Sequence, residues 1–370
     1  MRTSEPRRVG EEAGKLLAQV HSPGGLIAFV GGSLGAQLHH VARAIASACP
    51  GTPALVASGA WVLHEAAEFE DDSAAVLLAY SGSPATFFAA PGDDTLALGH
   101  ALAQTLQTAP GNRASAVLLL CSPEHFAPDL LIPLTHVPQP RSIFGAGTIG
   151  VPGAIAIDTG GTFLSGAVVA MLLYDLPQPK IDVSPAARLL TAPHEITAYD
   201  GSLVLELDGV PALEVLQRAG DKLAHRQVLC AALVDDTPAE QSRRPMLLRP
   251  IRGVDPQRGG LFLTAEIHPN TRMCIAAQSP TAAREDLETM ARQMRRSTAG
   301  AAPRFGVYLN CAARGSSLYG SVDVDRRLLH TAFPDLPLIG LSGAFELAPH
   351  AGVPRLHMYT GVLTVFTAPS

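Results

Sequence analysis

One ten-residue phrase occurs twice in this sequence, and the segments around it repeat as well. The phrase reads "TPALVASGAW" up to Trp61 and "LPLIGLSGAF" up to Phe345, with a Ser-Gly-Ala triplet that begins at Ser58 and at Ser342. A strand-like run and a helix-like run precede each copy: "LIAFVGGS" and "AQLHHVARAIASAC" before the first, "FGVYLNCAARG" and "DVDRRLLHTAF" before the second. Another strand-like run follows each copy. The sequence therefore predicts a repeated unit of strand, helix, strand and strand, with a small-residue turn before the last strand.

A third and weaker copy lies between these two, and a fourth portion has its own pattern. The third copy consists of "SAVLLLCSPEH", "RSIFGAGTIG" and "TFLSGAVVAMLLYD", where Gly-Ala-Gly replaces Ser-Gly-Ala. In the fourth portion, "LVLELDG" predicts a strand, "PALEVLQRAG" a helix, and "GLFLTAEIHP" with "RMCIAAQ" a hairpin. The segment "PTAAREDLETMARQMRRS", with Pro280 in its first turn, predicts an amphipathic helix.

These patterns predict an α/β protein of two packed halves with mixed sheets, built from repeated strand-helix-strand-strand units. The N-terminal half is expected at about residues 22–205 and the C-terminal half at about residues 206–367. The two Ser-Gly-Ala turns are expected to face a common region, around a pseudo-twofold axis. Small residues at these turns have a structural explanation, a sharp turn or a close backbone approach, and a functional one, backbone N–H groups exposed to a ligand. Both explanations remain open.

The composition excludes several classes of protein. Hydrophobic residues make up 47% of the 370 residues and charged residues 16%, so a large core is possible and disorder is not expected. The net charge of −6 disfavours nucleic acid and anionic membrane surfaces as partners. The longest apolar run, residues 166–174, is too short for membrane insertion, and the N-terminus lacks the apolar core of a signal peptide. We therefore expect a cytoplasmic protein, with its five scattered cysteines reduced and buried.

Three short motifs resemble catalytic or cofactor signatures. "GAGTIG" (145–150) has the letters of a dinucleotide-binding loop, but Pro152 and a strand-like run follow it where a helix is required. "DTGG" (158–161) lacks a second aspartic-protease triplet and fits a tight hairpin turn. "GGSLG" (31–35) lies between a strand and a helix, as a nucleophile elbow does, so a serine hydrolase that uses Ser33 remains an alternative. The thirteen histidines show no zinc-binding spacing.

Much of the chain resembles a known family. "NCAARG", "FPDLPLIGLSGAFELAP" and "LHMYTGVLTVF" are similar to the C-terminal half of the FIST domain family, and "LLRPIRGVDPQRGGLFL" and "AAREDLETM" to the part before it. "ITAYDGSLVLELDGVPALEVL" resembles the junction between the family's two halves, and "LVASGAWVLHEAAEFEDDSAAVLLAYSG" resembles the N-terminal half. The resemblance covers roughly residues 20–367. It implies a cytoplasmic sensory domain of bacterial signal transduction that binds a small ligand.

Two departures from the family pattern concern the expected pocket. Many members have Gly-Glu-Ile after the small-residue turn of the C-terminal half, where this chain has Phe345, Glu346 and Leu347. Where members often have Ser-Gln-Gly-Cys-Arg-Pro, this chain has "SPAARLL", which keeps Ser184 and Arg188 but not the cysteine. If that stretch lines the pocket, the ligand preference differs from that of the cysteine-containing members.

The resemblance and the repeat together suggest a ligand pocket in which the two phrases face each other. Arg314 can bind a carboxylate with two hydrogen bonds, Glu346 can bind an ammonium group, and Asn310 offers a donor and an acceptor. This set suits an amino acid or a similar metabolite, the ligand class suggested for the family. Alternatively, Arg314 and Glu346 pair with each other or lie in solvent. The expected pocket residues are Asn310, Arg314, Ser342, Gly343, Glu346, His357, Tyr359, Ser58, Trp61 and His64.

The expected function is that of a stand-alone sensory domain that is not an enzyme. No kinase, cyclase or methyl-accepting segment follows the last strand in this sequence, so the signal is expected to pass to a partner protein, such as a histidine kinase or another transducer. No cofactor is expected from the residues themselves. Because some FIST proteins are haem-binding nitric-oxide sensors, haem is an alternative, with His357 as the first candidate iron ligand and His64 as the second. A protein that binds only a partner, through an apolar patch, is a further alternative.

Overall fold

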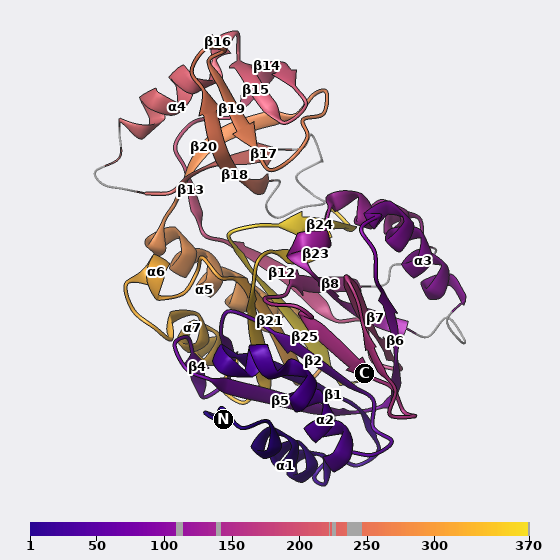
Figure 1. Cartoon of the computed structure of the whole chain (residues 1–370). Helices are drawn as coiled ribbons and strands as arrows, with labels where there is room; N and C mark the ends of the chain where they lie inside the picture. Colours follow the sequence, from indigo (N-terminus) through magenta and orange to yellow (C-terminus); the bar gives the residue numbers. More distant parts are fainter. Residues whose placement is uncertain (109–113, 138–141, 222, 224–226, 235–245, 369–370) are drawn as a thin grey trace.

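The chain folds into a mixed α/β structure with a body and a barrel (Figure 1). The computed structural model describes residues 1–108, 114–137, 142–221, 223, 227–234 and 246–368. Three sheets of five, six and six strands make up the body, and a further sheet closes into the barrel, which stands at one end of the body. The barrel, residues 187–278, is an insertion, because the chain leaves the body after residue 185 and returns to it at residue 280.

Three units in the body share one strand-pairing pattern. In each unit the first strand pairs in parallel with the second and antiparallel with the last. The strands of the three units are β1 (Pro23–Gly31), β2 (Ala54–Ser58) and β5 (Ala74–Ser81); β7 (Ala114–Cys121), β8 (Ser142–Gly147) and β11 (Val168–Tyr174); and β21 (Pro303–Cys311), β22 (Leu338–Gly343) and β25 (Thr360–Thr367). These units correspond to the three copies that the sequence predicts, and a small-residue turn lies at the end of the second strand in each.

A hairpin lies between the second and last strands of each unit, and it joins the sheet of a different unit. The hairpins are β3 (Val62–His64) with β4 (Ala67–Phe69), β9 (Ala154–Ile157) with β10 (Phe163–Ser165), and β23 (Glu346–His350) with β24 (Val353–His357). In the first unit's hairpin, β3 pairs with β22 of the third unit. In the second unit's hairpin, β9 pairs with β2 of the first unit, and in the third unit's hairpin, β23 pairs with β8 of the second unit. The predicted pseudo-twofold arrangement is therefore wrong, because three units exchange hairpins in a cycle. At the sheet edges, β6 (Ser83–Ala90) pairs with β11, and β12 (Lys180–Pro185) pairs with β25.

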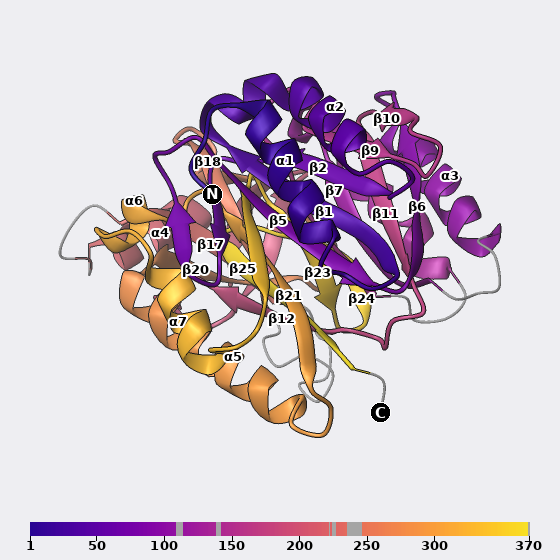
Figure 2. The ribbon, with the colours of Figure 1, turned by 90° about the horizontal axis from the view of Figure 1, so that it is seen from below.

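Helices cover the outer faces of the three sheets (Figure 2). They are α1 (Pro6–Leu17) and α2 (Leu38–Ala48) on the first sheet, α3 (Thr95–Thr108) on the second, and α5 (Pro280–Ser297) and α7 (Val324–Ala332) on the third. The first and third units have the predicted helix between their parallel strands. In the described part of the second unit's connection, three short 3₁₀ turns take the place of the helix, because each begins with a proline that cannot continue a helix. They are η3 (Pro123–His125), η4 (Pro128–Leu131) and η5 (Pro133–His136). Within the described parts of the chain, none of the helices has both the length and the hydropathy to cross a membrane.

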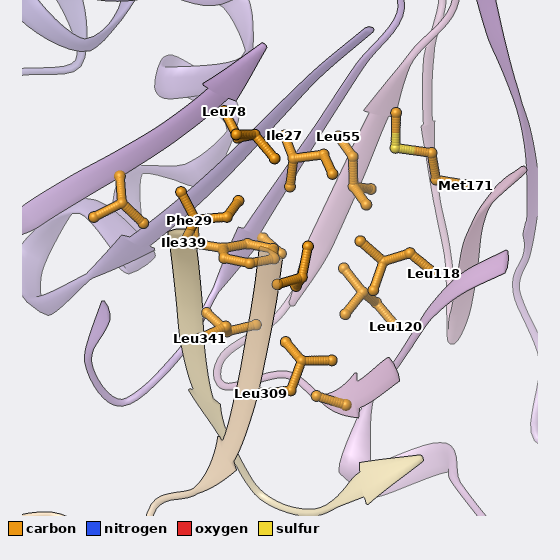
Figure 3. Packing of buried hydrophobic residues seen from close by; sticks show 14 of the residues in the cluster. Ile27, Phe29, Leu55, Leu78, Leu118, Leu120, Met171, Leu309, Ile339 and Leu341 are labelled. Atoms are coloured by element: carbon orange, nitrogen blue, oxygen red, sulfur yellow. The ribbon is translucent and has the colours of Figure 1, made fainter. Parts of the chain in front are cut away.

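The inner faces of the three sheets meet in one apolar core (Figure 3). Ile27 from β1, Leu118 from β7 and Leu309 from β21 point into this core, and all three side chains are fully buried. The alternate residues of the same strands face the covering helices. Because these strands are buried on both faces, their sequences read as unbroken apolar runs.

Six strands close the barrel, because β20 pairs with both β17 and β14. The ring runs through β14 (His194–Asp200), β15 (Leu203–Leu207), β19 (Gly260–Leu263), β18 (Met246–Asp255), β17 (Leu229–Val234) and β20 (Arg272–Gln278). Outside the ring lie α4 (Ala212–Gly220), β13 (Ala187–Leu189) and β16 (Val210–Pro211). The predicted hairpin of β19 with β20 is wrong. β19 forms a hairpin with β18, whose turn is held by Asp255 Oδ1, which accepts hydrogen bonds from the N–H groups of Gln257 and Arg258.

Candidate functional site

The small-residue turns of the three units meet at one place in the body. The N–H group of Ala60 donates to the carbonyl of Ser342 at 2.8 Å, and the N–H group of Ala344 donates to the carbonyl of Gly147 at 2.9 Å. A Cβ atom on Gly343 would lie only 2.3 Å from the carbonyl oxygen of Gly147. The backbones approach so closely that only glycine fits, and this contact explains the small residues of the repeated phrase.

Arg314, in the loop after β21, is fully buried and is bound to an aspartate of α7. Its Nε atom lies 2.9 Å from Oδ2 of Asp325, and its Nη2 atom lies 3.2 Å from Oδ1. The hydroxyl groups of Tyr308 and Tyr319 also donate to Asp325, at 2.7 and 2.6 Å. The exposed fractions of the Arg314 and Asp325 side chains are 0% and 2%. Arg314 therefore has a carboxylate partner within the chain, where the sequence suggested the carboxylate of a ligand.

The environment of Asp325 keeps it charged. Burial alone would raise the pKa of Asp325, but the positive charge of Arg314 and the hydrogen bonds from Arg314 and two tyrosines hold that pKa below its ordinary value. Sequence analysis missed this residue. The sequence does contain a signal for it, because Asp325 lies one helical turn before the apolar Leu329, on the buried face of α7. A carboxylate on a buried helix face needs a charged or hydrogen-bonding partner.

Three further polar side chains lie in one row across the third sheet, next to the ion pair. Ser184 of β12 and Asn310 of β21 both pair with Gly361 of β25, and Asn310 pairs with Ser342 of β22. The Nδ2 atom of Asn310 donates to Asp325 at 3.3 Å. The Oδ1 atom of Asn310 and the hydroxyl oxygens of Ser184 and Ser342 have no partner within the described residues. Because buried polar atoms are nearly always hydrogen-bonded, these three oxygen atoms can accept hydrogen bonds from water or from a small polar group.

Glu346, the first residue of β23, is a fully buried carboxyl group with one open oxygen. Its Oε2 atom accepts hydrogen bonds from the N–H group of Thr360 at 3.3 Å and from the hydroxyl of Thr360 at 2.5 Å. Its Oε1 atom has no partner within the described residues. Burial raises the pKa of Glu346 to about 8, although the Thr360 hydrogen bonds and the Arg314 charge act in the opposite direction. In the described structure Glu346 and Arg314 form no ion pair, and neither lies in solvent.

His357 lies on β24, directly opposite Glu346 in the strand ladder, and is buried. Burial, with His350 and Arg249 nearby, lowers the pKa of His357 to about 3, so the imidazole is neutral at neutral pH. Its Nε2 atom lies 3.3 Å from the carbonyl oxygen of Ala348, and its ring centroid lies 6.2 Å from that of His350. A neutral imidazole offers one donor and one acceptor nitrogen, so His357 can orient a polar ligand.

A cavity of about 330 Å³ lies where the barrel meets the body, and we call it the junction cavity. Its walls come from β12, α5, the β23–β24 hairpin and the start of β25 in the body, and from β18 in the barrel. It is lined by Lys180, Ile181, Asp182, Val183, Pro185, Met246, Leu248, Met294, Ser297, Pro349, His350, Ala351, Gly352, His357 and Thr360. The volume lies near the lower end of the range of about 300–1,000 Å³ that small-molecule sites occupy. Of the predicted pocket residues, His357 lines this cavity, and Glu346 adjoins it through Thr360.

The N-terminal pocket residues predicted from the sequence lie outside the junction cavity. The hydroxyl of Ser58 donates to the carbonyl of Ile149, so it belongs to the meeting point of the turns. Trp61 is buried, and its Nε1 atom has no partner within the described residues. The Nδ1 atom of His64 accepts a hydrogen bond from the N–H group of Ala66 at 3.2 Å. These three residues therefore belong to the turns and strands around Ser342 and do not line the junction cavity.

The structure also shows the surroundings of Ser33, the candidate nucleophile, and of the side chains that could bind a metal ion. Ser33 lies in the exposed turn η1 (Gly32–Gln37), with its hydroxyl oxygen 2.8 Å from that of Ser73. A histidine, which would activate a serine nucleophile, is not among the described contacts of Ser33. Among the residues that the structure describes, no group of three His, Cys, Asp or Glu side chains is placed to hold a metal ion. The "DTGG" segment forms the turn between β9 and β10, as predicted.

Both parts of the chain match domain models of one family. Residues 26–210 match the FIST N domain, and residues 212–349 match the FIST C domain. The chain belongs to the FIST family. In this FIST protein the barrel contains strands from both domains, since β14 and β15 lie within the first match and β17 to β20 within the second.

Relatives of this FIST protein occur in mycobacteria. The uncharacterized protein Rv0628c of Mycobacterium tuberculosis is 26% identical over 313 residues, which are 81% of this chain and 79% of the relative. The uncharacterized protein Mb0898c of Mycobacterium bovis is 27% identical over 317 residues, again 81% of this chain and 79% of the relative. The similarity therefore extends over both FIST domains, and the names of these relatives assign them no ligand.

Proposed function

We propose that this FIST protein is a sensory protein that binds a small ligand in the junction cavity and signals to a partner protein. The observation that carries the proposal is the polar floor of the cavity, formed by the buried Thr360 and His357. Behind Thr360 lies the carboxyl group of Glu346, whose Oε1 atom is open. Groups of this kind leave hydrogen bonds that a ligand can complete. Membership of the FIST family supports the sensory role.

The ligand that we propose carries a primary amine, as an amino acid does. Glu346 can accept a hydrogen bond from an ammonium group, whose charge would favour the ionised carboxylate despite its burial. Arg314 is not free to hold a ligand carboxylate, because both of its hydrogen bonds to Asp325 are in place. Lys180 lines the junction cavity and can supply the positive charge for that carboxylate instead.

Thermal-shift measurements against amino acids and small metabolites test this proposal. A ligand present at 100 times its Kd stabilises the folded protein by about 2.7 kcal/mol, which raises Tm by several degrees. The rise is expected to disappear in Glu346→Gln and in His357→Asn. It is expected to persist in His64→Asn, the matched control outside the cavity. A rise that is unchanged in Glu346→Gln would move the site elsewhere.

Haem bound through His357 is the second candidate function. Burial keeps this imidazole in the neutral form that binds metal ions, and this observation favours it over the more exposed His64. The Nε2 atom of His357 faces the carbonyl of Ala348, so Nδ1 is the nitrogen that would remain for iron. An absorption spectrum of protein expressed with a haem precursor is the test. A Soret band that His357→Ala abolishes supports haem, and no band in the wild-type protein excludes it.

We propose no catalytic role for Ser33, since the partner of its hydroxyl is Ser73 rather than a base. A fluorophosphonate probe tests this part of the proposal, because it reacts covalently with activated serines. Labelling of the wild-type protein that Ser33→Ala abolishes would contradict it. We further propose that the partner protein is a histidine kinase or a similar transducer and that the protein is cytoplasmic. We also propose that the chain consists of two halves that divide near residue 205.

A further inference from the structure

Two chain crossings join the barrel to the body, and a further segment of the body also contacts the barrel. The chain passes from β12 to β13 at residues 185–187 and returns from β20 to α5 at residues 278–280. Figure 1 shows the barrel standing clear of most of the body, with these crossings on one side. Residues 356–359, the end of β24 and the turn that leads to β25, also contact the barrel, and we call them the coupling segment.

Three residues of the coupling segment hold the barrel. The carbonyl of Leu356 accepts a hydrogen bond from Nη1 of Arg249 at 3.2 Å. The sulfur atom of Met358 lies 3.7 Å from the hydroxyl of Thr264. Tyr359 packs against an outer face of the barrel that is built mainly of small side chains, and we call this face the socket. The socket consists of Cys230, Ala232, Leu248, Cys274 and Ala276.

Tyr359 has a strained backbone between the socket and the cavity floor. Its φ is 57°, in the left-handed region that a bulky residue rarely adopts. Such a conformation persists only where neighbouring contacts hold it. Here the carbonyl of Tyr359 accepts a hydrogen bond from the N–H group of Ala186 at 3.0 Å, and the next residue, Thr360, is held by Glu346. A change at Thr360 would therefore alter how Tyr359 is held.

The coupling segment also borders the junction cavity. His357 lines the cavity, and so does Thr360 directly after the segment. Leu248 of the barrel lines the cavity as well, and it is part of the socket. A ligand in the cavity would therefore contact the segment that holds the barrel and the barrel itself.

We infer that the coupling segment transmits occupancy of the junction cavity to the barrel. A bound ligand changes how Tyr359 packs in the socket, and so changes how firmly the barrel is held against the body. This inference rests on the proposed ligand site and gives that site a means of regulation. A ligand shifts such an equilibrium because it contacts both parts only when they are closed on each other.

Two cysteines of the socket provide the measurement. The thiols of Cys230 and Cys274 are fully buried beside Tyr359, so their labelling by a maleimide reports how often the socket opens. Tyr359→Ala is expected to speed the labelling of both thiols by about tenfold or more. Tyr359→Phe, the matched control that keeps the ring, is expected to leave both rates unchanged. Cys121, buried in the body, reports global unfolding and is expected to stay protected.

Thr360→Val tests the link between the socket and the cavity. It removes the hydroxyl bond to Glu346 and keeps the shape of the side chain, so it is expected to speed the labelling of Cys230 but not of Cys121. If Tyr359→Ala exposes Cys121 as well, that variant is unfolded, and Thr360→Val decides alone. An unchanged rate at Cys230 in Thr360→Val overturns the inference. This failure is distinct from failure of the ligand site, which the thermal shifts test separately.

Discussion

Replacement of Asp325 by asparagine is expected to destabilise the folded protein strongly. The substitution keeps the shape of the side chain and removes the charge on which five hydrogen bonds converge, two of them from Arg314. Arg314 would then remain charged, with an exposed fraction of 0% and no carboxylate hydrogen-bonded to it. A buried guanidinium cannot readily lose its proton, so the folded state would bear the full penalty of an unpaired charge.

The burial of the pair sets the expected magnitude. Removal of one partner of a buried ion pair lowers the free energy of unfolding by about 3–5 kcal/mol, whereas an exposed pair contributes only about 0–1 kcal/mol. Arg7 and Glu11 form an exposed pair, with exposed fractions of 90% and 52%. Glu11→Gln is therefore the matched control, and its effect is expected to stay below about 1 kcal/mol.

Urea unfolding followed by circular dichroism measures both variants, as shifts of the midpoint at constant slope. The pH dependence adds a second check. Because the folded-state pKa of Asp325 is lowered, the pair stabilises the protein above about pH 4, and this stability is lost as the pH falls through the lowered value. A loss in Asp325→Asn no larger than that in Glu11→Gln would refute the reasoning.

Three further predictions concern the cavity floor and the meeting point of the turns. The folded-state pKa of Glu346 is raised from 4.5 to about 8, so between these pH values the folded protein binds more protons than the unfolded protein. The free energy of unfolding should therefore fall as the pH rises from 4.5 to about 8, and urea titrations of Glu346→Gln should not show this fall. The pKa of His357 is lowered from 6.5 to about 3, so stability should fall as the pH drops through that window, and His357→Asn should lack this fall in the same titrations. Gly343→Ala should lower the free energy of unfolding by about 1–3 kcal/mol, because the new Cβ atom would clash with the carbonyl oxygen of Gly147. Gly300→Ala is the control and should have little effect, because a Cβ atom there would meet open space. Equal urea midpoints for the two variants would contradict the clash.

The local elements could be predicted from the sequence, because strand and helix periodicity is a local property. The repeated phrase correctly indicates β2 and β22, and the strand-like runs before its two copies correctly indicate β1 and β21. Pro280 correctly marks the first turn of α5. The exchange of hairpins among the units could not be predicted, because register between distant strands leaves no local signal. The same limit explains the wrong hairpin of β19 with β20. The two strands follow each other in the sequence, but β19 pairs with β15 and β18.

The candidate site divides in a similar way. The sequence indicates Arg314 and Glu346 as candidate pocket residues, and the structure shows that both are buried. Their partners, Asp325 and Thr360, come from other elements, and only the tertiary fold brings them into contact. Side-chain pairing of this kind depends on helix docking and strand register. The residue types alone therefore cannot distinguish a pair of side chains that binds a ligand from an ion pair within the protein.

A crystal structure of the protein grown with the amine-bearing compound that raises its Tm most is the most direct test of the central claim. The claim predicts density for that compound in the junction cavity, with its amine within hydrogen-bonding distance of Glu346 or Thr360. It also predicts that the Arg314–Asp325 pair is intact in the complex. Density for the compound at another place, with the junction cavity unchanged, would contradict the claim.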